Sequence, residues 1–226
     1  MAALVWRLIG ALYILFMISP LVLVGLFSFT DGGMANFPIH ALTLKWWEAM
    51  LANPAFTSAL TNSLIIGLVV SVISAILGTM AAMGLSQLPP AVANSVMLVL
   101  STPLMLPPLV LGVALLSFYV AAGIRLGLVT VIMSQLLFTL PFVILVIVAR
   151  LRSFDFRIVE SARDLGASQL TAFRTVTLPV IQPSIIGAAL ISLALSLDDF
   201  IVTFFTIGSG NTLPTFVWGM IRTSLT

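Results

Sequence analysis

The sequence contains very little charge and no cysteine. Only 7% of its 226 residues are charged, against about 25% in average soluble domains, while 61% are hydrophobic. So little polar surface cannot coat a globule in water, which excludes a soluble domain and predicts a protein embedded in lipid. The absence of cysteine excludes disulfides, thiol catalysis and cysteine metal sites.

Histidine and lysine occur once each, as His40 and Lys45. A phosphate-binding loop needs a glycine-rich turn that ends in Gly-Lys-Ser or Gly-Lys-Thr, but Lys45 lies in Thr-Leu-Lys-Trp. A single histidine excludes paired-histidine metal sites. We therefore predict no catalytic residue, no metal site and no enzyme, and the small net charge of +2 gives no reason to expect nucleic acid as a partner.

Long apolar runs are what the sequence does contain. A membrane span takes about 20 apolar residues at ~1.5 Å of helical rise each. The first run has 22 uncharged residues, longer than the ~7–15 of a signal-peptide core, so it is a retained span. We predict one all-α membrane domain over residues 1–226 with five spans, at residues 8–29, 63–85, 96–122, 127–149 and 185–207.

The third run contains Pro103, Pro107 and Pro108. Proline removes a backbone donor and bends or breaks a helix. Broken backbone is tolerated at membrane depth only where it faces protein or a water-filled cavity. We therefore predict a broken span that faces the interior, with an ordinary proline kink as the alternative.

The basic residues predict how the chain is oriented in the membrane. Loops with more Lys and Arg face the cytoplasm. A cytoplasmic N-terminus places six arginines inside and three basic residues outside, which agrees with that rule. The inner six are Arg7, Arg150, Arg152, Arg157, Arg163 and Arg174, and the outer three are Lys45, Arg125 and Arg222.

The predicted cytoplasmic loop, residues 150–184, has an amphipathic pattern. Ile158, Ala162 and Leu165 recur at helical spacing, so residues 155–165 are predicted to form a short helix that Asp155 caps.

Three residues then predict how the loop continues. Gly166 suits the left-handed residue that ends a helix, and Ser168 can cap a second helix. Pro179 is predicted to end that second helix before the fifth span. From this pattern alone, the alternative is a solvated connector with no partner.

The loop also resembles the EAA motif of permeases of ATP-binding-cassette importers, in which Glu-Ala-Ala, three residues, Gly, nine residues and Ile-x-Leu-Pro follow one another. Ser161 stands for the first Ala and Val176 for Ile, with the spacing intact. The resemblance implies a type I importer transmembrane domain whose coupling helix docks on a cytoplasmic ATPase. The residues implied in coupling are Glu160, Ser161, Ala162, Gly166, Val176, Leu178 and Pro179.

The resemblance extends to the spermidine/putrescine branch of these permeases, through residues 42–50, Asn62-Ser63-Leu64, residues 103–112 and Ser196-Leu197-Asp198-Asp199-Phe200. It implies a permease subunit of the bacterial inner membrane that carries a polyamine. The implied partners are two cytoplasmic ATP-binding subunits, a second permease subunit, identical or homologous, and a periplasmic solute-binding protein. The chain itself would bind no cofactor, and ATP and Mg would be used by the partner ATPase.

Asp198 and Asp199 lie inside the fifth apolar run. A charged residue near the centre of a span costs about 2.5–3.5 kcal/mol, so at least one should face a polar interior. Neighbouring residues on a helix point ~100° apart. One carboxylate can therefore line a substrate path while the other bonds a neighbouring helix; the alternative is a structural pair of hydrogen-bonding acids.

Two further expectations concern the chain as a whole. The resembled permeases have six spans, so five spans imply that a sixth is missing beyond Thr226. A self-sufficient secondary transporter would also bury carboxylates and broken helices. Such folds often contain inverted repeats, which we do not find here.

Overall fold

The computed structural model describes residues 2–32, 39 and 41–224; His40 lies outside the described residues. Nearly all of the described backbone is helical, and its β-pairing is an isolated bridge between Thr30 and Leu42. The chain divides into two compact units, residues 1–57 and 58–226, each described here by itself.

The first unit contains α1 (Ala2–Phe27) and α2 (Lys45–Ala52). α1 has the length and the hydropathy of a membrane span, as predicted for residues 8–29. The segment between the two helices is tied to α2 by side chains. Trp46 Nε1 donates to Thr30 O at 3.0 Å, and Lys45 Nζ donates to Asp31 O at 2.7 Å.

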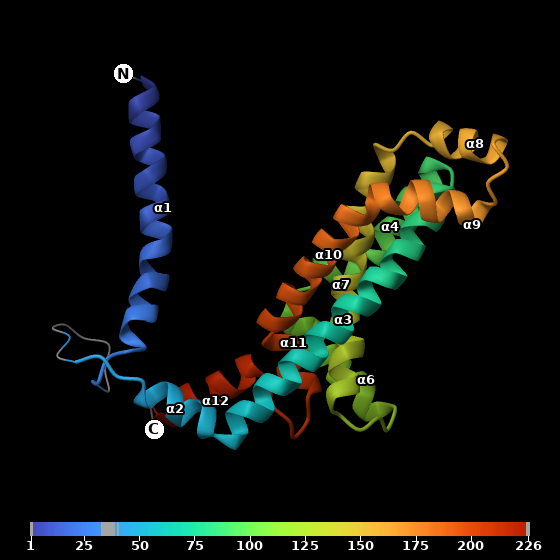
Figure 1. Cartoon of the computed structure of the whole chain (residues 1–226). Coiled ribbons are helices and arrows are strands. Elements are labelled where there is room, and N and C mark those ends of the chain that lie inside the picture. Colours follow the sequence, from blue (N-terminus) through green and yellow to red (C-terminus); the bar gives the residue numbers. More distant parts are fainter. Residues whose placement is uncertain (1, 33–38, 40, 225–226) are drawn as a thin grey trace. The chain divides into compact units, whose positions relative to one another are not determined.

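The second unit is a helical bundle (Figure 1). Its long helices are α3 (Pro54–Ser86), which begins in the first unit, α7 (Leu128–Arg152) and α10 (Leu178–Asp198), which packs along α7. Buried apolar side chains of α3, α7 and α10 form the core near one end of the bundle, including Ala82, Ile144, Ile147 and Ile181. Gly78 lets α3 approach α7 closely, since a Cβ there would lie 2.7 Å from Val143 Cγ1.

The third predicted span is broken, as its prolines predict. It consists of α4 (Pro90–Leu100), α5 (Thr102–Met105) and α6 (Pro108–Ala121). Leu106 is extended, and α6 begins at Pro108, where the missing N–H costs no helical hydrogen bond.

The fifth predicted span is not one helix over residues 185–207, and that prediction was wrong. α10 ends at Asp198, Asp199 is extended (φ −69°, ψ 109°), and α11 (Ile201–Thr206) follows as a separate short helix. A final helix, α12, runs over Leu213–Ser224. The physical cause of the break is the capping by Asp199 described below.

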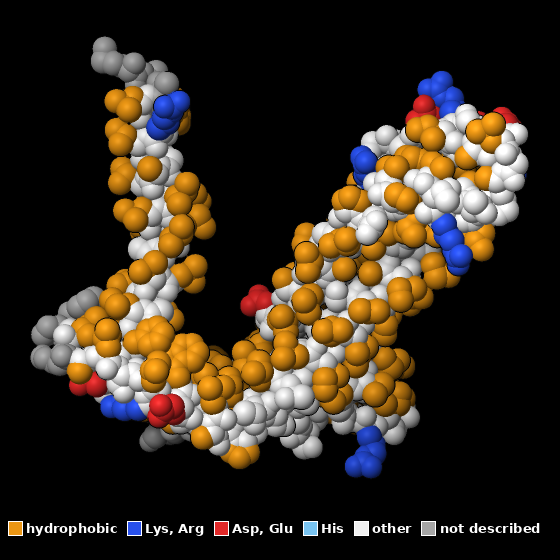
Figure 2. Space-filling view, viewed as in Figure 1, with side chains coloured by type: hydrophobic (Ala, Val, Ile, Leu, Met, Phe, Trp, Pro, Cys, Tyr) orange, Lys and Arg blue, Asp and Glu red, His pale blue; other side chains and the backbone are white. Residues whose placement is uncertain are grey.

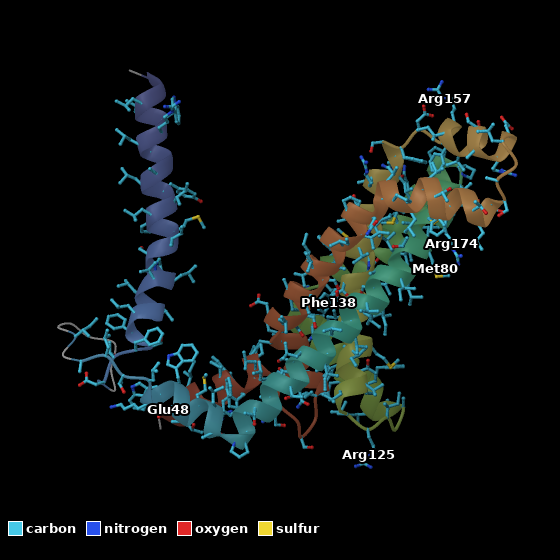
Figure 3. The ribbon with its side chains drawn as sticks, viewed as in Figure 1. Glu48, Met80, Arg125, Phe138, Arg157 and Arg174 are labelled. Atoms are coloured by element: carbon cyan, nitrogen blue, oxygen red, sulfur yellow. The ribbon has the colours of Figure 1, made fainter. Side chains whose placement is uncertain are left out.

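Among the residues that the structure describes, four helical stretches are long and apolar enough to cross a membrane: Leu4–Phe27, Pro54–Ser86, Leu128–Arg152 and Gln169–Asp198. Figure 2 shows hydrophobic side chains covering the sides of the bundle formed by the second unit. Basic residues lie at its ends, with Arg157 and Arg174 at one end and Arg125 at the other (Figure 3). This is the distribution that a bilayer requires of a spanning bundle.

Candidate functional site

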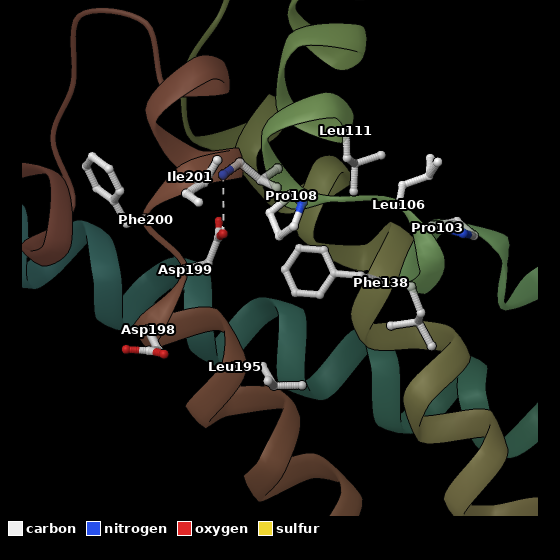
Figure 4. A pocket seen from close by; sticks show the side chains of 12 residues that line it. Pro103, Leu106, Pro108, Leu111, Phe138, Leu195, Asp198, Asp199, Phe200 and Ile201 are labelled. Atoms are coloured by element: carbon white, nitrogen blue, oxygen red, sulfur yellow. Dashed lines mark hydrogen bonds between the residues drawn. The ribbon is translucent and has the colours of Figure 1, made fainter.

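A pocket of about 490 Å³ lies where the two broken helices meet. One wall comes from the α5–α6 break and the other from the α10–α11 break, and Figure 4 shows the side chains that face it. Most of the lining is apolar. The polar exceptions are the carboxylates of Asp198 and Asp199.

Asp199 caps the first turn of α11. Its Oδ1 accepts from Val202 N at 3.3 Å, and its Oδ2 accepts from Thr203 N at 2.9 Å and from Thr203 Oγ1 at 2.7 Å. A carboxylate at a helix N-terminus satisfies free amides and interacts favourably with the helix dipole. This capping explains why the helix stops at Asp198 and restarts at Ile201.

Gln135, on α7, stabilises this break through hydrogen bonds to residues on both sides of it. The sequence analysis did not predict this role. Its side chain is 1% exposed. Its Nε2 donates to Thr203 Oγ1 at 3.0 Å and to Asp199 Oδ2 at 3.3 Å, while its Oε1 accepts from Ser196 Oγ. The sequence signal that could have identified it is an amide side chain within an apolar run, because such a group requires polar partners at membrane depth.

Asp198 points away from Asp199 (Figure 4). In the described part of the chain it accepts no hydrogen bond and forms no ion pair, and it is exposed. The two neighbouring carboxylates therefore differ chemically. The carboxylate of Asp199 accepts hydrogen bonds that hold the fold together, whereas Asp198 presents an unpaired carboxylate to the pocket.

The loop after α7 forms the short amphipathic helix that the sequence predicts, α8 (Arg157–Asp164). Gly166 has φ +91° and ends it. Its N–H donates to Arg163 O at 2.9 Å, and Ala167 N donates to Ala162 O at 3.1 Å. This pair of bonds is a Schellman motif. In it, Gly166 supplies the left-handed backbone conformation, and the carbonyl of Ala162 accepts one of the two closing bonds.

After this turn the chain continues directly into the bundle. Ser168 Oγ accepts from Thr171 N at 3.2 Å and caps α9 (Gln169–Ala172), as predicted. The prediction that Pro179 ends this helix was wrong. A π-helical turn, η1 (Phe173–Thr177), precedes α10, and Leu178 N donates to Phe173 O five residues back. The wider turn accommodates a proline near the start of α10 without a break.

Asp155 begins the loop helix with an exposed ion pair. Arg157 Nη2 lies 2.9 Å from Asp155 Oδ2, and the amide of Arg157 donates to Asp155 Oδ1 at 3.0 Å. These bonds from Arg157 lower the pKa of the Asp155 carboxyl.

The structure thus places the predicted residues at two separate sites within the second unit. Asp198 and Asp199 meet at the pocket, and the EAA-like residues lie in the loop at the end of the bundle that carries α8. Glu160, Ser161, Gly166 and Pro179 are exposed there, whereas Ala162, Val176 and Leu178 are half-buried where α8 packs against η1.

The fold is that of a multi-span membrane protein with a pocket between two broken helices and an exposed loop at one end of its bundle. Residues 74–226 match the family described as "Binding-protein-dependent transport system inner membrane component". The chain belongs to this family.

Two relatives of similar sequence and one solved structure of similar fold are consistent with this family. The chain is 32% identical over 183 residues to the spermidine/putrescine transport system permease protein PotC of Haemophilus influenzae, covering 80% of this chain and 71% of that one. It is 32% identical over 226 residues to the putrescine transport system permease protein PotI of Escherichia coli strain K12, covering 96% and 80%. A crystal structure of a bacterial alginate ABC transporter, in complex with a periplasmic protein carrying an alginate pentasaccharide, shares the fold. Its TM-score is 0.71 at 15% identity, covering 98% of this chain and 84% of that one.

The chain is therefore a permease subunit of an ATP-binding-cassette importer, a multi-pass protein of the inner membrane. It is not an enzyme, since ATP hydrolysis in these importers belongs to a separate subunit. This agrees with the prediction from the EAA-like spacing.

Proposed function

We propose that this permease carries a small cationic solute, a polyamine such as spermidine or putrescine, along a path that includes the pocket between the two helix breaks. The observation that carries the proposal is the unpaired carboxylate of Asp198 at that pocket. An ammonium group that leaves water needs a charged partner, and Asp198 supplies one without disturbing the fold. The relatives PotC and PotI support the same substrate class by their names.

The two aspartates provide a matched test. In a reconstituted importer we expect Asp198→Asn to lower the uptake of radiolabelled spermidine and putrescine about tenfold, the effect of losing one charge-assisted bond. Asp199→Asn keeps an oxygen that can cap α11, since Asn and Asp cap equally well, and should retain most of the uptake. Wild-type preference for an anionic solute, or full polyamine uptake by Asp198→Asn, would refute the proposal.

The loop from Arg157 to Pro179 is proposed to dock on one of two cytoplasmic ATP-binding subunits, which use the ATP and Mg. Leu165 supports this, because its large apolar side chain is 90% exposed at the end of α8. An exposed apolar residue beside charged ones is typical of a protein contact. A second permease subunit and a periplasmic solute-binding protein are proposed to complete the importer.

Two loop substitutions test this docking. Glu160→Lys reverses a charge on α8, and Gly166→Pro replaces the left-handed residue that turns the chain. Both should abolish co-purification of the ATPase and ATP-dependent uptake. Glu48→Lys on α2 is the control, because it reverses an equally exposed acidic residue outside the loop. If all three variants assemble and transport alike, the loop is a connector only.

The N-terminus is proposed to lie in the cytoplasm, together with the loop. The chain has no native cysteine, so single cysteines can be introduced directly. In intact cells with a permeabilised outer membrane, a membrane-impermeant maleimide should label Arg125→Cys and leave Arg7→Cys and Arg174→Cys unlabelled. The opposite labelling pattern would invert the proposed orientation.

A further inference from the structure

A second pocket, of about 350 Å³, lies at the end of the bundle that carries α8 and takes no part in the proposed substrate path. It forms where α3 ends, α4 begins and α7 ends. Its walls are largely apolar and include Leu85, Leu88, Val148, Phe154 and Phe156. A lining of this kind accommodates hydrocarbon rather than a soluble ion.

Arg152 is the charged side chain in this lining. Its Nη2 donates to Asn94 Oδ1 at 2.9 Å, which fixes the guanidinium beside the apolar walls. No carboxylate within the described ranges pairs with it. A guanidinium has five N–H donors in a planar fork that suits phosphate oxygens, and most of them remain available here.

The start of α4 adds to the positive character of the same pocket. α4 begins at Pro90, which lines the pocket, and no side chain caps its first turn. A helix N-terminus carries partial positive charge and favours anions. Pro89 and Pro90 have no N–H to donate, so this helix end contributes only its dipole, and Arg152 contributes the hydrogen-bond donors.

The position of the pocket along the bundle favours a lipid as its occupant. The long apolar helix α3 ends at Ser86, and α7 ends at Arg152, so the pocket lies where the hydrocarbon core gives way to lipid headgroups. We propose that it binds a phospholipid with an anionic headgroup, its phosphate on Arg152 and an acyl chain along the apolar wall. A zwitterionic headgroup fits less well, because the lining contains no carboxylate for its ammonium.

The test uses the assembled importer, purified in mild detergent and analysed for retained lipid by native mass spectrometry with added phosphatidylglycerol or phosphatidylethanolamine. We expect wild type to retain phosphatidylglycerol preferentially and Arg152→Gln to retain it about tenfold less. Arg152→Lys, which keeps the charge but loses the fork, should be intermediate. Arg125→Gln, at the other end of the bundle, should match wild type.

Four results would overturn the proposal. Arg152→Gln could retain phosphatidylglycerol as wild type does, or Arg125→Gln could lose it equally, which would indicate a general charge effect. Inorganic phosphate alone could displace the lipid and raise the melting temperature as phosphatidylglycerol does, which would indicate a free-anion site. Loss of the ATPase from Arg152→Gln with lipid retention unchanged would instead assign the pocket to a protein partner.

Discussion

The break between α10 and α11 and the loop around α8 are both irregular, but different forces hold them. At the break, buried side chains of α7 and α11 converge on Asp199. In the loop, the turn at Gly166 is made by backbone bonds between near neighbours, and its ion pair is exposed. Because unmet polar groups cost most where water is absent, the break should tolerate substitution far less than the loop does.

The largest expected effect follows from removing the cap at the break. Asp199→Leu leaves two backbone amides and the Thr203 hydroxyl without their acceptor, and it removes one of the acceptors of the Gln135 amide. We expect a loss of about 3 kcal/mol or more in the free energy of unfolding, measured by denaturation in detergent. Asp198→Leu removes an unpaired carboxylate and should not destabilise the fold; equal losses from both variants would erase the distinction between the two aspartates.

Removing the lateral support should have the next largest effect. Gln135→Leu keeps the bulk of the side chain but leaves Ser196 Oγ and Thr203 Oγ1 with fewer partners, at a cost of about 2 kcal/mol. Gln87→Leu, in the exposed segment between α3 and α4, makes the same chemical change and should be nearly neutral. Thermal unfolding of the two variants in the same detergent makes the comparison.

In the loop, the backbone of Gly166 should account for a smaller effect. No atom lies within 4 Å of a Cβ built there, so Gly166→Ala causes no clash. Its only cost is the left-handed φ, which should lower the free energy of unfolding by about 1 kcal/mol. Gly84→Ala, in the helical part of α3 and equally free of contacts, should stabilise by about 0.5–1 kcal/mol. Hydrogen exchange of the α8 amides should rise in the first variant and not in the second.

The smallest effect concerns the ion pair of Asp155 and Arg157. A carboxyl whose pKa is lowered in the folded state stabilises it at neutral pH, and this contribution is lost as the pH falls through the lowered pKa. We expect Arg157→Gln to return the pKa of Asp155 toward its ordinary value of 3.8 and to lower the melting temperature at pH 7 only slightly, because the pair is exposed. Carboxyl NMR of the labelled protein measures the pKa. A large drop in the melting temperature would contradict this prediction, because it would show that the ion pair stabilises the whole fold and not only the start of α8.

The two helix breaks show how far prediction from sequence reached. The break before Pro108 was predicted because proline acts on its own neighbours. The break after Asp198 was missed, because Ser-Leu-Asp-Asp-Phe contains no proline. An aspartate before an apolar run is itself a helix-start signal, and it was interpreted only as a charge. The opposite error occurred at Pro179, where a π-helical turn keeps the helix going.

The sequence by itself determined that this chain spans a membrane, that its basic loop turns at Gly166 and that its motif spacing is that of an importer permease. Those signals are carried by composition or by residues within a few positions of one another. Only the tertiary structure decided which of two adjacent aspartates is free. Asp199 is occupied by its own helix start and by Gln135, 64 residues away in the sequence, and no local pattern encodes a partner at that separation. The free carboxylate of Asp198 is what remains after that pairing.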